Sequence, residues 1–257
     1  MTQENVPPAM SPAGCALPPE VIALLAATSE PYLITGTVAA FQYHRWLSPP
    51  PGLLALKVHA SALGDWEQML ARDGVRAFTS PPSQRDVEAL DLAVVLDPTL
   101  TPALYARRRM VGSLSYEAPE DLVLTLLARS RGETSIAEAA AILITQHEQI
   151  DWDYLAERAI ASGQARPLGI LGEIIRREAG TRYVPTEFVT RLRRTPAFPA
   201  TDETRYYPLN WQVKYALRRN RPERIRSTYP DISAHWNVTV TLPRHVIAKV
   251  VADLRVA

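Results

Sequence analysis

The chain has 257 residues, of which 47% are hydrophobic and 21% charged, and its formal net charge is +1. This content is enough for one large domain, or for one domain with a smaller appendage. The single cysteine, Cys15, excludes an intrachain disulfide and a cysteine-based zinc site. No apolar run approaches the ~20 residues of a membrane span, and no charged-then-apolar leader opens the chain. We therefore expect a cytoplasmic protein without a membrane partner.

The small net charge hides two parts of opposite charge. Residues 1–165 contain 11 basic and 19 acidic residues, for a net charge of −8. Residues 166–257 contain 17 basic and 8 acidic residues, for a net charge of +9. A basic tail on an acidic body predicts that one part meets a polyanion while the other folds, regulates or catalyses.

The first half of the chain alternates strand and helix patterns. Residues 1–19 contain five prolines and are expected to form a disordered leader. Apolar runs then predict three buried strands, and helical spacing predicts three helices between and before them. The expected strands cover residues 32–35, 53–58 and 90–96, and the expected helices cover residues 19–27, 37–46 and 61–72.

Residues 119–165 form the clearest helical region. Pro119 followed by Glu120 and Asp121 is typical of the first turn of a helix. Ser135 with Glu138 matches a capping box that begins a second helix. Asp151 can cap a third helix, which Gly163 ends, and a further helix is expected over residues 166–184. Together these patterns predict an α+β fold in which a mixed sheet is joined to a helical bundle.

Three stretches, at residues 33–40, 90–94 and 118–124, occur in an order and spacing that can be compared with known families. Residues 139–143 and 150–155 continue the pattern into the helical region. Over residues 20–175 the chain resembles nucleotidyltransferase-fold proteins of toxin–antitoxin and abortive-infection systems. The resemblance implies a nucleotidyltransferase-like body over this range.

Catalytic members of that family place a glycine turn before a helix and two carboxylates, one residue apart, on the next strand. Those carboxylates bind two magnesium ions, and a third comes from a later strand. The resemblance places a relict nucleotide site at Gly36, Thr37 and Asp91. The strand from Leu53 to Val58 contains no Asp or Glu, so we expect a pseudoenzyme with no catalytic residue, no metal and no cofactor.

Without the paired carboxylates, the chain resembles the antitoxins that accompany abortive-infection toxins, which share this body but have no active site. Those antitoxins carry an N-terminal winged helix, for which residues 1–19 are too short. An antitoxin-like chain would have a cognate toxin as its protein partner.

The basic tail carries the strongest functional signal. Residues 176–226 hold 13 basic and 5 acidic residues with aromatic residues between them, and nearly all the basic ones are arginine. Arginine forks onto phosphate and stacks on bases as lysine cannot. Phosphate contacts of this kind give salt-sensitive affinity without sequence information. The residues expected to bind nucleic acid are Arg191, Arg193, Arg194, Lys214, Arg218, Arg219, Arg221 and Arg224.

The tail is also expected to fold as a smaller basic α/β domain over residues 185–257. A helix is predicted over 210–220, a strand over 235–242 and a helix from Pro243 to about residue 255, an order compatible with a winged-helix-like module. The last helix could serve as a homodimer face. The positive charge could equally dock the tail onto the acidic body.

The leading hypothesis is a non-enzymatic regulator that binds double-stranded DNA for transcription regulation and is antitoxin-like. One alternative is an active magnesium-dependent nucleotidyltransferase using Asp65, Glu67, Asp91 and Asp97. Another is an interaction protein that sequesters a toxin through its acidic body. The triplet from Arg107 to Arg109 was a further candidate for gripping phosphate.

Overall fold

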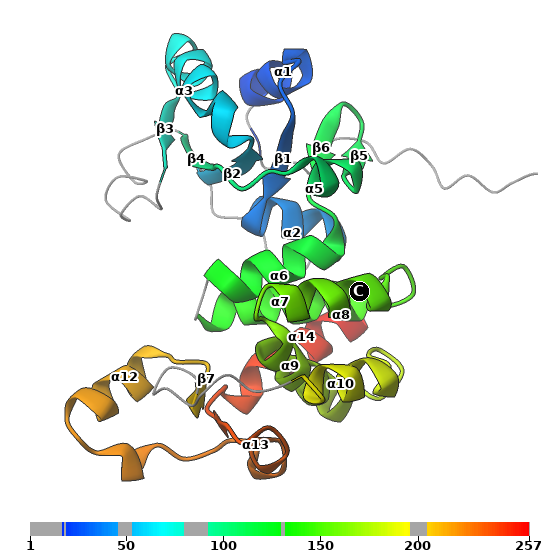
Figure 1. The fold of residues 1–257 in the computed structure, drawn as a ribbon, viewed down its shortest axis with the longest axis vertical. Helices are drawn as coiled ribbons and strands as arrows, with labels where there is room; N and C mark the ends of the chain where they lie inside the picture. The colour runs from blue at the N-terminus through cyan, green and yellow to red at the C-terminus, as the bar shows by residue number, and fades with distance from the viewer. Residues whose placement is uncertain are drawn as a thin grey trace, which may run out of the picture.

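The structure, a computed structural model, describes residues 17, 19–45, 53–79, 92–129, 132–195 and 205–256. These residues form a mixed α/β protein, with a sheet near one end and a helical bundle towards the other (Figure 1). The strands are β1 (Tyr32–Thr35), β2 (Leu53–Val58), β3 (Arg76–Phe78), β4 (Ala93–Asp97), β5 (Arg109–Val111), β6 (Leu114–Tyr116), β7 (Tyr206–Tyr207) and β8 (Thr239–Val240).

The helices of the sheet end and of the bundle follow one another along the chain. Those at the sheet end are α1 (Pro19–Ala27), α2 (Gly36–His44), the 3-10 turn η1 (Ala60–Ala62), α3 (Leu63–Arg72) and α5 (Pro102–Ala106). Those of the bundle are α6 (Pro119–Arg129), α7 (Glu133–Thr145), α8 (Trp152–Ala161), α9 (Ala165–Glu178) and α10 (Thr186–Arg193). The C-terminal part adds α12 (Trp211–Arg218), the 3-10 turn η2 (Pro222–Arg224), α13 (Pro230–Trp236) and α14 (Arg244–Val256).

The main sheet has six strands in the order β3-β4-β2-β1-β6-β5. β1 pairs antiparallel with β2, which places Leu33 opposite Lys57, and it pairs parallel with β6 on its other side. β2 pairs parallel with β4, and β5 and β6 form an antiparallel hairpin at the edge. In Figure 1, α2 lies between the sheet and the bundle, where it contacts β1, β2, α6 and α7.

The C-terminal residues complete the bundle. α14 packs against α7 and α9, and α13 packs against α9. One cluster of buried apolar side chains extends from Leu17 to Val251 and includes residues of the sheet, the bundle and the tail. The expected division into a body over residues 20–175 and a domain over 185–257 stays a prediction, as do its nucleotidyltransferase-like and winged-helix-like topologies.

Several local predictions are confirmed. β2 covers residues 53–58 as expected from its apolar run. Asp151 caps α8 by accepting a hydrogen bond from the Tyr154 backbone N–H at 3.0 Å. α12 lies inside the helix predicted over 210–220, and Asn210 caps it by accepting from the Val213 N–H at 3.0 Å.

Two predictions at helix ends were wrong. The expected strand over residues 235–242 begins inside α13, because Pro230 starts that helix and Asn237 ends it in the left-handed conformation with φ of 50°. Only the two residues of β8 are a strand. The Ser135–Glu138 capping box does not form, because α7 begins at Glu133 with Gly132 as its N-cap. Most of the leader predicted over residues 1–19 lies outside the described residues, as does Asp91, while Pro19 begins α1.

Candidate nucleic-acid interface

A segment from Trp211 to Arg226 extends from the bundle and is called the basic arm below. It consists of α12, the turn that follows it, η2 and two further residues. Val213 is buried and anchors α12, while most other residues of the arm are exposed. Figure 1 shows α12 and the chain after it standing out at the side of α9, α13 and α14. The arm therefore offers an accessible surface on a helical support.

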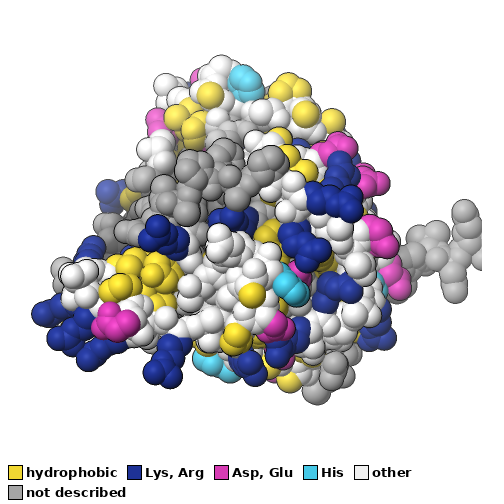
Figure 2. Space-filling view, turned by 60° about the horizontal axis from the view of Figure 1, so that its bottom comes forward, with side chains coloured by type: hydrophobic (Ala, Val, Ile, Leu, Met, Phe, Trp, Pro, Cys, Tyr) yellow, Lys and Arg dark blue, Asp and Glu magenta, His cyan; other side chains and the backbone are white. Residues whose placement is uncertain are grey.

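The arm has six basic residues and a single acidic one, Glu223. All six basic residues are exposed, and among the described residues none of them forms an ion pair. Figure 2 shows a group of Lys and Arg side chains projecting at the left of the molecule around an apolar patch. Unpaired positive charge of this density attracts a polyanion, with a strength that salt weakens. The six are Lys214, Arg218, Arg219, Arg221, Arg224 and Arg226.

Two aromatic side chains lie on the same arm. Trp211 is 73% exposed and Tyr215 is 56% exposed, the highest values among the large hydrophobic residues that the structure describes as exposed. The Arg219 guanidinium lies 5.5 Å from the centre of the Tyr215 ring, within the range of a cation–π contact. Exposed apolar side chains that lie together on one helix, unlike singly scattered ones, are typical of interaction surfaces.

The structure separates the predicted nucleic-acid-binding residues into two groups. Lys214, Arg218, Arg219, Arg221 and Arg224 belong to the basic arm. The other three are Arg191 and Arg193 on α10 and Arg194, its C-cap residue, and α10 lies on the opposite side of the bundle from α12 (Figure 1).

One arginine of the α10 group docks the tail onto the acidic body. The Arg191 guanidinium donates hydrogen bonds to Asp153 at 2.9 Å and to Glu157 at 3.2 Å, both on α8. Arg193 and Arg194 are exposed beside it. Docking of the tail onto the acidic body, one of the two uses foreseen for its positive charge, therefore occurs at Arg191.

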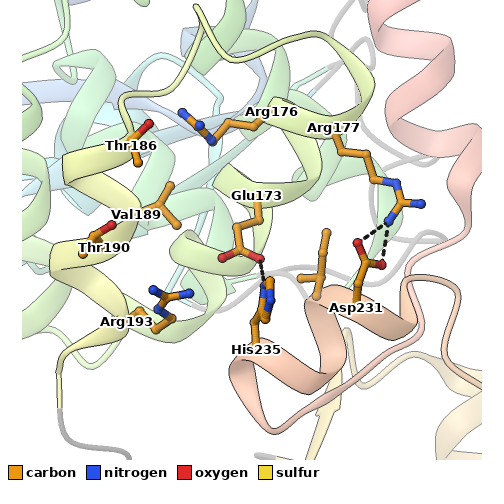
Figure 3. A pocket seen from close by; sticks show the side chains of 10 residues that line it. Glu173, Arg176, Arg177, Thr186, Val189, Thr190, Arg193, Asp231 and His235 are labelled. Carbon is orange, nitrogen blue, oxygen red and sulfur yellow. Dashed lines mark hydrogen bonds and ion pairs between the residues drawn. The ribbon is translucent and has the colours of Figure 1, made fainter.

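Arg193 lines a pocket of about 400 Å³ between α9, α10 and α13 (Figure 3). Most charges in this pocket are internally satisfied. Arg177 donates to both carboxylate oxygens of Asp231 at 2.6 and 2.7 Å, and Arg176 donates to the Val184 carbonyl at 2.6 Å. His235 lies 3.4 Å from Glu173. The pocket lies where three helices meet. Because most of its charged side chains are paired with one another, they do not indicate which ligand it would bind.

At the expected relict site, Gly36 makes the turn into α2 with φ of 68°, which glycine adopts without strain. The neighbouring strands hold an internal ion pair. Lys57 on β2 donates to the buried Glu117 carboxylate and to the Thr125 hydroxyl, the latter at 2.7 Å. Thr125 donates to the same carboxylate at 2.8 Å, and Thr35 donates to its other oxygen. Glu117 is completely buried.

The start of α6 forms an acidic junction that the sequence analysis missed. Glu120 accepts from the Asp151 backbone N–H at 2.9 Å, and Asp121 accepts from Tyr154 at 3.0 Å and from Arg158 at 3.4 Å. Both carboxylates are buried. Glu120 and Asp121, which the sequence analysis interpreted only as favourable charges at the start of a helix, therefore connect α6 to α8 and its N-cap. The spacing of acids at 117, 120 and 121 beside apolar residues is the signal that could have indicated it.

The arginine triplet is used within the molecule. Arg107 lies over the Tyr154 ring, 3.6 Å from its centre, and Arg108 lies over the Tyr105 ring. Arg109 donates to the Gln149 side chain at 2.6 Å. These contacts favour a role in packing over the phosphate grip considered from the sequence.

The carboxylates proposed for an active enzyme are not brought together where the structure describes them. Asp65 and Glu67 are two residues apart on α3, about 200° around the helix from each other. Asp97 is in register with Lys57 on the neighbouring strand. Within the described residues no group of three or more His, Cys, Asp or Glu side chains could hold a metal ion.

Glu138 on α7 is a buried carboxyl group near the relict site. Thr37 donates to its Oε2 at 3.5 Å, and its Oε1 has no hydrogen-bond partner among the described residues. Burial raises the pKa of Glu138 to about 7 from the ordinary value of 4.5, because the charged form loses its hydration. The Thr37 hydrogen bond opposes this shift.

This raised pKa predicts a pH-dependent stability. The folded state holds the proton more tightly than the unfolded chain, so the contribution of Glu138 is greatest below about pH 4.5 and is lost as the pH rises to about 7. The expected loss is about 3 kcal/mol across this window. Glu138→Gln should abolish it, which urea unfolding of both proteins from pH 4.5 to 8 would measure. Parallel stability curves for the two proteins would contradict the prediction.

No helix among the described residues has the length and apolar character needed to cross a membrane. Comparisons with protein-family models, with curated proteins and with solved structures found no match to this chain.

Proposed function

We propose that this chain is a non-enzymatic nucleic-acid-binding regulator, antitoxin-like and with a cognate toxin as its protein partner, that contacts phosphates through the basic arm. The observation that carries the proposal is the group of six exposed basic residues on the arm, none of them in an ion pair within the described part of the chain. Duplex DNA is the ligand expected from the sequence. Arginine suits phosphate recognition because its planar fork matches two oxygens at once.

The rival explanation of the charge is docking between the tail and the acidic body. Arg191 serves that purpose, since it bridges Asp153 and Glu157 on α8. The arginines of the arm have no such partners. Internal docking therefore explains some of the positive charge of the tail. The basic side chains of the arm are not used in this way and can bind an external polyanion.

The non-enzymatic part of the proposal is supported by the Lys57–Glu117 pair. A magnesium-dependent transferase needs carboxylates that are free to bind metal and that face a substrate. Glu117 instead accepts hydrogen bonds from a lysine and two threonines in the protein interior. β2 contributes an ammonium group where the resemblance leads us to expect paired carboxylates.

The proposal predicts salt-sensitive binding to a short duplex. Six phosphate contacts would give a slope of about −5 for log K against log salt concentration. Replacing both Arg218 and Arg219 by Glu should weaken binding and make that slope shallower by about 2. Fluorescence anisotropy of a labelled 20-base-pair duplex at several salt concentrations would measure both quantities.

The matched control uses two exposed arginines outside the basic arm, Arg193 at the end of α10 and its C-cap residue Arg194. Replacing both by Glu makes the same change of net charge as the Arg218 and Arg219 substitutions. Binding by this control should remain close to that of the original protein. Equal loss in both variants would show that net charge alone is responsible, and failure of duplex and single strand alike to bind at low salt would overturn the proposed function.

A further inference from the structure

We infer that the basic arm binds unpaired bases, so that its ligand is a single-stranded nucleic acid whose bases stack on Trp211 and Tyr215. This inference rests on the proposed function and narrows its ligand. It adds a role for the two exposed rings, which phosphate binding does not need.

The basic and aromatic side chains of α12, together with that of its C-cap residue Arg219, form one continuous arc. With 100° between successive helical residues, the order around the axis is Lys214, Arg218, Trp211, Tyr215 and Arg219, over about 140°. All five side chains are exposed. The buried Val213 lies on the opposite side of the helix and holds this arc outward. Each residue of the arc can therefore either stack on a base or bind a phosphate.

The spacing of the two rings fits an unstacked strand. Trp211 and Tyr215 are four residues apart, which corresponds to a rise of about 6 Å along the helix. Neighbouring bases of a duplex are only about 3.4 Å apart and already stack on each other. Two consecutive bases can reach both rings only when they are separated from each other, as in a single strand.

Charge surrounds the rings as such a ligand requires. Lys214 and Arg218 lie on one side of the aromatic pair and Arg219 on the other, so a sugar–phosphate backbone can follow the basic residues while its bases meet the rings. No acidic residue lies on the arc. Exposed Trp, Tyr and Arg also occur at protein interfaces, but six basic residues against one acidic residue favour a polyanion.

The test compares a labelled 12-nucleotide single strand with a duplex of the same length at two salt concentrations. We expect the single strand to bind at least tenfold more tightly. Trp211→Ala and Tyr215→Ala should each weaken single-strand binding about 5- to 100-fold, because each removes one stacked base. The fold-loss of affinity in each alanine variant should be the same at both salt concentrations. The fold-loss in the Arg218→Glu/Arg219→Glu protein should instead become smaller as the salt concentration rises.

Tryptophan fluorescence gives an independent readout. Among the described tryptophans Trp66 and Trp236 are buried and Trp152 is half-buried, so Trp211 is the one most accessible to a bound single strand and should contribute most of their quenching. Trp211→Phe keeps an aromatic ring on which a base can stack, so this variant should retain most of the affinity for the single strand. It lacks the Trp211 fluorophore, so the quenching that Trp211 contributes in the original protein should disappear. The difference between these two titrations isolates residue 211 from the other tryptophans.

The outcomes separate this inference from the proposed function. Duplex binding as tight as single-strand binding, together with unchanged affinity in the Trp211→Ala protein, would overturn the stacking role and leave the proposed function in place. Failure of every nucleic acid to bind at low salt would overturn both. Preference for the single strand with loss in both alanine variants would support both.

Discussion

Replacing Glu117 by Gln is expected to lower the free energy of unfolding by about 3–5 kcal/mol, because the Lys57 ammonium would remain buried without its counter-charge. Lys57 is only 7% exposed and Glu117 is not exposed at all. Loss of either charge leaves the other in surroundings that cannot hydrate it. Lys57→Met should therefore destabilise the protein by a similar amount.

The double substitution Lys57→Met with Glu117→Leu should recover most of this loss. Exchange of a whole buried ion pair for apolar side chains is often close to neutral, because the cost of desolvating both charges disappears with their attraction. Thr35 and Thr125 would lose their shared acceptor, which keeps the recovery incomplete. A double-mutant cycle by urea unfolding measures the coupling between the two positions.

An exposed ion pair provides the matched control. Arg177 and Asp231 form a bidentate pair whose side chains are 39% and 59% exposed. Arg177→Met should cost at most about 1 kcal/mol, since water replaces the partner. A cost at Glu117 no greater than at Arg177, or additive effects of the Lys57 and Glu117 substitutions, would show that the buried pair is not coupled as described.

This buried pair also shows where prediction from sequence ends. The strand carrying Lys57 was predicted with its observed bounds, because an apolar run between turn residues is a local signal. The partner of Lys57 lies 60 residues further along the chain, next to β6, a strand that the sequence analysis did not predict. Lys57 was read as a departure from a family pattern because nothing local identifies the acid that neutralises it.

The candidate interface follows the same division. The density of arginine in the tail was visible in the sequence, and the helix predicted over residues 210–220 contains α12. The sequence did not show which arginines form ion pairs within the molecule and which are exposed and can bind a ligand. Arg191 differs from Arg218 only through Asp153 and Glu157, which lie 38 and 34 residues before it. Exposure of Trp211 likewise depends on how the arm leaves the bundle.

The junction between α9 and α13 depends on a close approach at Gly169. A Cβ atom added to Gly169 would lie 2.1 Å from Cη2 of the Trp236 ring and 2.5 Å from its Cζ2. Trp236 is buried, so its ring has little room to move away. This contact therefore fixes α13, the helix that follows the basic arm in the chain, against α9.

Gly169→Ala should therefore lower the free energy of unfolding by about 1–3 kcal/mol through overpacking. Gly64→Ala on α3 is the matched control, since a Cβ there meets nothing within 4 Å. That control should stabilise the protein by up to about 1 kcal/mol, because alanine favours a helix more than glycine does. Thermal and urea unfolding followed by circular dichroism would measure both changes.

Repeating Gly169→Ala in a Trp236→Leu protein tests whether the ring contact is the cause. In a Trp236→Leu protein the ring that meets the new methyl group is absent, so Gly169→Ala should change from destabilising to neutral or stabilising. A cost of Gly169→Ala that persists in the leucine background would place the strain elsewhere in α9. A reversal of sign would assign it to the ring contact, because backbone propensity at residue 169 is the same in both backgrounds.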